Sequence, residues 1–451
     1  MEKRDSFFER FFGISQSGST MKIEILAGIT TFITIAYILI LNPQILADPY
    51  VIMGDTVMAG KISNGVFIGT CIGAFIGTIL CALYAKVPFA QAPGMGLNAF
   101  FAYTVVLAMG YTYNQALVIV FISGIFFIVI TAVGLREAII RSIPDAVKMA
   151  ITPGIGLFIT IIGLKNSGLV VGNSATLVSM VDFAQWRSEG GDVSLICGAL
   201  VALIGLIVIG VLNARNVKGS IIIGILVATA AGIPLGVTKL SSFDMNLGAK
   251  FSDFAEVSLF KMDFAGLFAG DNIVSTFFTV VMLVLSFSLV NMFDSIGTLM
   301  GAARQSGMID ENGEIIHMKE ALMSDAISTA AGAMVGTSTV TTVVESSAGI
   351  AAGGRTGMTS LVTAVMFLAS IIFAPIVSIV PGQATAPALI FVGILMLSNI
   401  KEVDFSEMSN ALPAFCTVVF MPFTYSIANG VAVGLITYCF MKLFTGKARE
   451  I

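Results

Sequence analysis

The chain has 451 residues, of which 57% are hydrophobic and only 11% are charged, and its mean hydropathy is +0.97. Soluble domains carry about a quarter charged residues, so this composition excludes a water-exposed surface over most of the chain. The apolar residues come in long runs, which indicates an all-α polytopic membrane protein. The formal net charge of −4 is small and no basic patch is interleaved with aromatic residues, so we expect no nucleic-acid partner.

The cysteines and the single histidine argue against metal and cofactor chemistry. The five cysteines lie inside apolar runs without a CxxC pair, which is typical of small buried side chains. The only histidine, His317, lies in a polar segment. We therefore expect no metal site, no cofactor and no Ser/His or Cys/His nucleophile, and the chain is not predicted to be an enzyme.

The segment before the first apolar run, residues 1–23, is charged and too interrupted for the hydrophobic region of a signal peptide. We expect no cleaved signal. Phe7, Phe8, Phe11 and Phe12 follow helical spacing. This segment is predicted either to lie on the membrane surface or to be a disordered tail.

A helical span needs about 20 apolar residues, and we find fourteen segments that fit this length or approach it. The predicted spans are 24–42, 65–85, 88–108, 115–135, 147–164, 192–212, 218–236, 272–300, 318–336, 340–356, 358–380, 384–399, 411–428 and 430–445. They predict a first seven-span repeat at 24–236 and a second at 272–445. An extracytoplasmic connecting loop at 237–271 separates the repeats, and a cytoplasmic tail follows at 446–451.

The distribution of basic residues predicts the orientation. With fourteen spans, 17 of the 23 Lys and Arg residues lie on the side of the N-terminus, and 6 lie on the other side. Such an excess marks the cytoplasmic side. We expect a plasma-membrane protein with both termini in the cytoplasm.

The second predicted span carries a glycine at every fourth position, which places four of them on one helix face. They are Gly65, Gly69, Gly73 and Gly77. Such a stripe lets two backbones approach closely. We interpret it as a packing surface against a neighbouring helix and not as a ligand surface.

Short matches between the two halves predict an internal repeat. In chain order, Ala92–Asn98 of the third span matches Glu345–Ala351 of the tenth, Pro153 of the fifth matches Pro387 of the twelfth, and Gly224 of the seventh matches Gly434 of the fourteenth. Seven spans per half is an odd number, so the two halves cross the membrane in opposite senses. The interrupted third and tenth spans then mark a substrate site near the midplane.

Asp294 is the first candidate site residue because it follows a long apolar run in the eighth span. A carboxylate in lipid is costly, so its side chain is expected to face the protein interior or a cavity. Thr298 lies one helical turn after Asp294 on the same face, and Asn291 lies one turn before it. The alternative is a carboxylate at the cytoplasmic mouth, near Arg304.

Glu345 is the second candidate, and it lies where two sequence patterns meet in the tenth span. Every residue from Thr339 to Val344 is β-branched, which favours an extended strand. Ser346 and the small residues after it suit a helix start. A short strand followed by a half-helix would direct free N–H groups toward a ligand. The alternative is that Glu345 only caps this half-helix.

The third span holds the counterpart of this junction. Pro93 and two glycines interrupt regular structure before a helix that carries Asn98, whose amide offers donors and an acceptor. The alternative for Asn98 is an interhelical hydrogen bond. The same stretch matches the dinucleotide pattern G-x-G-x-x-A, which we reject because it lies in an apolar span without a βαβ unit. Asp325, in the ninth span, is expected to have a structural pairing role.

Two carboxylates across a pocket suit a neutral, planar solute that carries hydrogen-bond donors. Phe100, Phe101 and Phe293 are candidates for stacking on its ring, or else belong to the core. A buried carboxylate also binds protons more readily, which would couple the solute to a proton. An anionic cargo is an alternative that the two acids disfavour. An intramembrane aspartyl enzyme is another, but no GxGD or metal motif accompanies the acids.

The stretches Gln91–Phe101, Phe293–Thr298 and Glu345–Ile350 resemble those of AzgA-like purine permeases in the nucleobase/ascorbate transporter superfamily, and the resemblance runs from Ile25 to about Phe444. It implies 14 transmembrane segments in two inverted seven-span repeats, with short strands in spans three and ten. It implies a core domain of spans one to four and eight to eleven, and a gate domain of the other spans. It also implies proton-coupled import of hypoxanthine, guanine or adenine, and frequently a homodimer.

By the same resemblance, Asp294 and Glu345 are expected to hold the base, and Asn98 is expected to be needed for function. The further predicted substrate-binding residues are Val344, Thr298 and Phe293. Asp294 and Glu345 are also the expected proton-coupling groups. Relatives that carry uracil or xanthine often have a histidine where this chain has Thr298, which favours the purine branch. The purine base and membrane lipid are therefore the expected partners, with uracil, xanthine or an anion as the alternative cargo.

Overall fold

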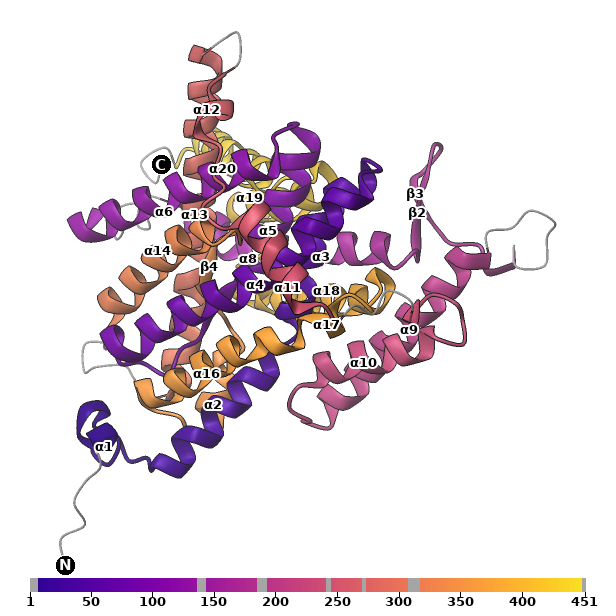
Figure 1. Ribbon diagram of the computed structural model, residues 1–451. Coiled ribbons are helices and arrows are strands. Elements are labelled where there is room, and N and C mark those ends of the chain that lie inside the picture. The colour runs from indigo at the N-terminus through magenta and orange to yellow at the C-terminus, as the bar shows by residue number, and fades with distance from the viewer. Residues whose placement is uncertain are drawn as a thin grey trace, which may run out of the picture. The chain divides into compact units, whose positions relative to one another are not determined.

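The computed structural model describes residues 7–135, 143–184, 193–240, 245–269, 273–306 and 317–447, and these are mainly helical (Figure 1). Within these ranges, nine helical segments of at least 18 residues are long and apolar enough to cross a membrane. Each of the fourteen predicted spans contains at least one helix. Residues 1–6 of the predicted N-terminal segment and 448–451 of the predicted tail lie outside the described ranges.

Contacts divide the chain into two compact units, and each unit draws on both halves of the sequence. The first unit is Met1–Ala138 with Asn246–Ala374, and the second is Ile139–Met245 with Pro375–Ile451. The first unit holds predicted spans one to four and eight to eleven, and the second holds the others. The expected division into a core domain and a gate domain is confirmed.

The first unit contains two short strands among its helices. Its helices are α1 (Phe7–Phe12), α2 (Met21–Ile35), α3 (Ile38–Ile52), α4 (Thr56–Leu80), α5 (Met95–Ala99), α6 (Tyr113–Val133), α11 (Leu247–Asp253), α12 (Phe264–Leu267), α13 (Ile273–Ser306), α14 (Met318–Met334), α15 (Ser346–Ala351) and α16 (Gly357–Ala369). Its strands are β1 (Gln91–Pro93) and β4 (Val340–Thr342). π-helical segments cover Cys81–Ala85, Phe100–Ala108 and Phe254–Ser258, and a 3-10 turn covers Ser370–Phe373.

The N-terminal segment is helical at α1 and is anchored to the first unit. Phe12 and Ile14 are buried against Met358 of α16. The alternative of a disordered tail is therefore wrong for these residues. Phe7 and Phe8 remain exposed, as a helix at a membrane surface requires.

The first predicted span is broken into α2 and α3 by a turn at Ala36 and Tyr37. Figure 1 shows α2 beside α16, and α2 also contacts α15. Tyr37 is the residue before α3, and its side chain is only 1% exposed. The break thus places a tyrosine in the interior of the unit, at the end of the helix that packs on α15.

The glycine stripe of α4 confirms the predicted close packing. A Cβ on Gly69 would lie 2.3 Å from the carbonyl oxygen of Val335, which is closer than real Cβ contacts allow. The other glycines of the stripe face three different segments, through Ser258, Thr337 and Gln91. The stripe therefore lets α4 approach the end of α14, the π-helical segment Phe254–Ser258, the residues before β4, and β1.

Glu24, near the start of α2, is completely buried and bonds to the start of α16. Its carboxylate accepts hydrogen bonds from the backbone N–H of Arg355 (3.0 Å) and Thr356 (3.3 Å), and from the Thr359 hydroxyl (2.6 Å). These two N–H groups belong to the residues just before α16, where the helix dipole also favours a negative charge. Glu24 thus ties α2 to α16.

We expect Glu24→Gln to lower the stability of the protein by about 1–3 kcal/mol, because the amide nitrogen cannot accept the hydrogen bonds that one carboxylate oxygen accepts. Thermal unfolding of the purified protein in detergent measures this. Glu256→Gln is the control, since Glu256 is an exposed partner of Lys61. Equal melting temperatures for the two variants would contradict the capping role of Glu24.

The second unit is built on two helices that pack against each other and on two helical pairs. Its helices are α8 (Asp145–Asn166), α9 (Val193–Ala214), α10 (Ser220–Gly232), α17 (Ala374–Val377, which begins at the boundary), α18 (Gly382–Leu397), α19 (Met408–Thr424) and α20 (Ile427–Phe444). A hairpin of β2 (Val170–Asn173) and β3 (Leu177–Met180) follows α8, and a 3-10 turn covers Ser398–Glu402.

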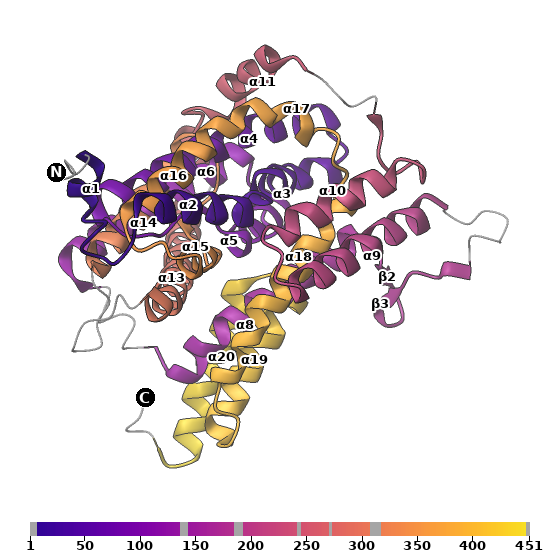
Figure 2. The ribbon, with the colours of Figure 1, turned by 90° about the horizontal axis from the view of Figure 1, so that it is seen from below.

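The sequence matches between the two halves fall at corresponding places in this unit. Pro153 and Pro387 lie inside α8 and α18, and these two helices pack against each other. Gly224 of α10 lies against α9, as Gly434 of α20 lies against α19. Figure 2 shows α19 and α20 side by side next to α8. The order of the elements agrees with the predicted repeat.

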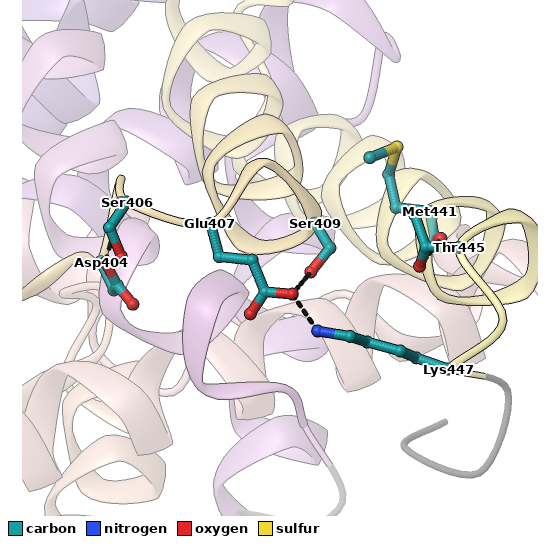
Figure 3. A network of polar contacts seen from close by, with 7 residues as sticks. All are labelled: Asp404, Ser406, Glu407, Ser409, Met441, Thr445 and Lys447. Atoms are coloured by element: carbon teal, nitrogen blue, oxygen red, sulfur yellow. Dashed lines mark hydrogen bonds and ion pairs between the residues drawn. The ribbon is translucent and has the colours of Figure 1, made fainter.

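A polar cluster closes the open end of the α19–α20 pair (Figure 3). Glu407, just before α19, forms an ion pair with Lys447 beyond the end of α20 and accepts a hydrogen bond from Ser409 at 2.8 Å. The Lys447 ammonium, and after it the Ser409 hydroxyl, holds the pKa of Glu407 below its usual range. The pair thus joins the two helix ends at neutral pH.

Two segments contain more structure than predicted. The predicted connecting loop at 237–271 contains α11, a π-helical turn and α12, and Phe254, Val257 and Ser258 there are buried. The hairpin β2–β3 was not predicted either, although Gly172, Asn173 and Ser174 form a turn signal between two stretches that contain valine. Both segments are too short and too mixed in polarity to stand out among long apolar runs.

Candidate functional site

Strands β1 and β4 bring the third and tenth predicted spans together in the first unit. They pair antiparallel, with Gln91 opposite Thr342, Ala92 opposite Thr341 and Pro93 opposite Val340. The strands predicted for these two spans are confirmed. A helix follows each strand, α5 after β1 and α15 after β4. The pairing therefore places the two interrupted segments of the repeat side by side.

Asp294 lies on α13, which contacts β4, α5 and α15. A Cβ on Gly94, between β1 and α5, would lie 3.7 Å from Oδ2 of Asp294 and only 2.9 Å from the Thr341 side chain. Glycine at this position thus allows the β1–α5 junction to approach both the strand and the acid. Asp294 is partly exposed.

Glu345 is the residue before α15, and it is partly exposed as well. Its side chain forms no capping hydrogen bond to α15. Its Oε1 instead accepts a hydrogen bond of 2.5 Å from the Tyr37 hydroxyl. The alternative in which Glu345 only caps the half-helix is therefore wrong.

The start of α15 does not present the free N–H groups that the sequence predicted. The N–H groups of Ser346, Ser347 and Ala348 donate to the carbonyl oxygens of the residues three positions earlier, at 3.0–3.1 Å. The expectation is wrong for these three groups, because a tight turn precedes the helix and uses them. At the other junction the N-cap of α5 is Gly94. Since glycine has no side chain to accept from the first turn, N–H groups of α5 are the better candidates for a ligand.

Asn98 is completely buried in a chain of neutral hydrogen bonds. Its Nδ2 donates to Oδ1 of Asn42 at 2.6 Å, and its Oδ1 accepts from the Ser338 hydroxyl. Asn42 in turn donates to Thr70 at 2.7 Å and to Thr337 at 2.8 Å. This arrangement favours the interhelical alternative, in which Asn98 holds α5 against α3 and the segment before β4.

The other predicted site residues differ in exposure. Val344 is 54% exposed, whereas Thr298 and Phe293 are buried on α13 near Asp294. Phe100 and Phe101 are completely buried. Phe100 packs edge-on against Phe287 with ring centroids 4.9 Å apart, and Phe101 packs against Tyr113 at 5.9 Å. These two rings belong to the core, and the structure does not bring them to the two acids.

Asp325 stabilises strand β4, in agreement with its predicted structural role. Its Oδ1 accepts from the backbone N–H of Thr342 at 2.8 Å, and its Oδ2 accepts from the Ser295 hydroxyl at 2.6 Å. Ser295 is also 2.9 Å from the hydroxyl of Thr341. Because Ser295 follows Asp294 directly, this network fixes the part of α13 that carries the first candidate acid.

Sequence reasoning missed Tyr37 and Asn42. Both lie in the first predicted span, among apolar residues that carry no motif. One signal was available for Asn42, because a polar amide in an apolar span is expected to bond to another helix. No comparable signal marked Tyr37, whose partner is 308 positions away.

The arrangement suits binding of a polar, uncharged ligand. Two partly exposed carboxylates accept hydrogen bonds, and the first turn of α5 supplies N–H donors beside Asp294. Among the described residues, no group of three or more His, Cys, Asp or Glu side chains is arranged to hold a metal ion.

Comparisons with known proteins agree with this fold. A model of a "Permease family" matches residues 22–433. The adenine permease AdeQ of Escherichia coli is 39% identical over 98% of this chain and 92% of its own length. The guanine/hypoxanthine permease PbuO of Bacillus subtilis is 39% identical over 98% of this chain and 96% of its own length.

Among solved structures, the transmembrane domain of a cyanobacterium bicarbonate transporter, BicA, matches with a TM-score of 0.60 at 16% identity. The match covers 92% of this chain and 97% of that domain, which shows a shared fold. The family match covers most of the chain, and the relatives match over nearly their whole length. The chain therefore belongs to the permease family, as a multi-pass membrane protein of two inverted seven-span repeats.

Proposed function

We propose that this protein is a secondary active transporter that imports purine nucleobases by proton symport. The cargo is hypoxanthine or guanine, with adenine as a further substrate. The observation that carries the proposal is the near full-length likeness to relatives named as adenine and guanine/hypoxanthine permeases. The two partly exposed acids at the β1–β4 junction support it, because purine bases present ring N–H and amino groups that carboxylates accept.

In this proposal Asp294 and Glu345 bind the base and one of them carries the proton. N–H groups at the start of α5 donate to ring nitrogens and carbonyl oxygens of the base. Val344, Thr298 and Phe293 form the walls beside the acids, and Asn98 acts through its buried hydrogen bonds.

We further propose the following organisation, membrane orientation and assembly for this chain. The repeats extend over 24–236 and 272–445, and the segment 237–271 lies on the extracytoplasmic side. The protein lies in the plasma membrane with both termini in the cytoplasm, forms a homodimer, carries out no enzymatic reaction, and uses no cofactor beyond the coupling proton.

An anion is the rival cargo, because a bicarbonate transporter shares the fold. A likeness at 16% identity concerns the fold alone. An anionic cargo requires positive groups at its site. Asp294 and Glu345 instead bring negative charge to the junction of β1 and β4, which favours a neutral base.

Uptake of labelled hypoxanthine in cells that lack their own purine carriers tests the proposal. We expect saturable uptake that unlabelled guanine and adenine reduce, that uracil reduces less, and that a protonophore abolishes. Cells with empty vector are the control. No uptake above this control, with the protein detected in the membrane, would overturn the proposal.

A further inference from the structure

The Tyr37 hydroxyl lies 2.5 Å from Oε1 of Glu345 and is the donor in this hydrogen bond. Tyr37 is 1% exposed and comes from the break between α2 and α3. Glu345 lies 308 positions later in the sequence, just before α15. The bond therefore joins the first span to the tenth at the candidate site.

The orientation of Glu345 depends on this bond. The carboxylate does not bond to α15 as a cap, and the N–H groups of Ser346, Ser347 and Ala348 are taken by backbone carbonyls. A glutamate side chain has three rotatable bonds, so an oxygen fixed at one point restricts the whole carboxylate. The carboxylate accepts from the Tyr37 hydroxyl at Oε1 and also from the backbone N–H of Glu345 itself. A carboxylate has about four acceptor sites on its two oxygens, so Oε2 can still accept from a ligand.

The helix that follows Glu345, α15, is held at its C-terminal end. Arg355 donates from Nη1 to the carbonyl oxygens of Ile350 and Gly354, both at 2.7 Å, which fixes the end of α15. Glu24 of α2 accepts from the N–H of Arg355. Since α15 is fixed at its end and packs on α2, the remaining freedom at its start is the Glu345 side chain. Tyr37, in the turn between α2 and α3, removes that freedom.

We propose that Tyr37 is a positioning residue for the cargo: its hydroxyl holds Oε1 of Glu345 so that Oε2 faces an N–H donor of the purine base. This inference rests on the proposed function. Tyr37 does not contact the base in this proposal. It acts by preorganising Glu345, the acid that binds the base.

Tyr37→Phe removes only the hydroxyl and keeps the ring. We expect the KM for hypoxanthine to rise about tenfold, because a hydrogen bond to a charged group is lost. Vmax is expected to stay within about twofold of the wild type, since translocation does not require this bond. Replacement of Tyr37 by p-aminophenylalanine keeps a donor at the same place, and is expected to restore a KM near that of the wild type.

Tyr103→Phe is the matched control. The Tyr103 hydroxyl donates to Oδ2 of Asp48 at 2.6 Å in the same unit, and Tyr103 is also buried. The two substitutions thus remove the same kind of bond, to a different carboxylate. We expect an unchanged KM for Tyr103→Phe.

A double-mutant cycle tests the bond without any transport. Melting temperatures in detergent are compared for wild type, Tyr37→Phe, Glu345→Met and the double variant, because methionine leaves no oxygen to accept from the Tyr37 hydroxyl. We expect Tyr37→Phe to lower the melting temperature in the wild-type background and to have little further effect when Glu345 is already replaced. Additive effects would show that the two side chains do not interact.

The two measurements separate failure of the inference from failure of the proposed function. Coupling in the cycle with a KM that stays at the wild-type value would overturn the positioning role. Additive melting temperatures would overturn the bond itself. No purine uptake by the wild type would overturn the proposed function and the positioning role with it, while the cycle still decides whether Tyr37 holds Glu345.

Discussion

Asp294→Asn and Glu345→Gln are each expected to reduce purine uptake at least about 100-fold, with the amount of protein in the membrane unchanged. Each substitution keeps the size of the side chain but removes the charge and one acceptor. A site built to bond polar groups loses more than a site built on apolar contact, because the ligand's donors are then desolvated without partners. Initial rates of hypoxanthine uptake at a subsaturating concentration measure the effect.

Glu256→Gln is the control for these two variants. Glu256 lies in the same unit, is exposed and pairs with Lys61, so uptake is expected to stay at the wild-type level. Wild-type uptake by either Asp294→Asn or Glu345→Gln would show that this acid is not needed to bind the cargo. If only one variant retained uptake, the cargo would be bound by the other acid and by the N–H groups at the start of α5.

Gly69→Val is expected to prevent recovery of folded protein or to lower its stability by about 3 kcal/mol or more. A Cβ at this position would be 2.3 Å from the carbonyl oxygen of Val335, and this backbone atom has no rotamer to move away. The valine would force α4 away from the end of α14 and so disturb the segment that leads into β4. Fluorescence-detected gel filtration of the solubilised protein measures recovery.

Gly60→Val is the matched control for helix propensity. Gly60 lies on the same helix, and a Cβ there meets nothing within 4 Å. Both substitutions raise helix propensity by the same small amount, since valine is a better helix former than glycine, so the difference between the variants reports the close contact. Equal recovery of the two variants would contradict the packing role of the glycine stripe.

Much of the fold was predictable because lipid restricts spanning segments to helices with internal hydrogen bonds. Long apolar runs such as Val193–Ala214 therefore indicate their helices directly. The short strand Val340–Thr342 was predictable as well, because six β-branched residues in succession disfavour a helix. The amphipathic segments around α11 and the hairpin β2–β3 were not, since they are short and their structure depends on what they pack against.

From the sequence, only those site residues could be predicted whose side chains are energetically unfavourable in a membrane span. Asp294 and Glu345 stand out because burying a carboxylate in a membrane span is energetically costly, which indicates a functional role. The identity of their partners depends on how distant segments pack, which no local pattern encodes. Tyr37 becomes relevant through a break in its span and a partner 308 positions away. Asn98 illustrates the converse, since its motif is conspicuous and its side chain is committed to Asn42 and Ser338.

The most direct test of the proposed transport is uptake by the purified protein in lipid vesicles. Labelled hypoxanthine is added outside vesicles with an acidic exterior, and labelled bicarbonate is added to a parallel set. We predict that hypoxanthine accumulates above its external concentration, that a protonophore abolishes the accumulation, and that bicarbonate enters no faster than into empty vesicles. Entry of bicarbonate without entry of hypoxanthine would contradict the proposal and would assign this chain an anion as its cargo.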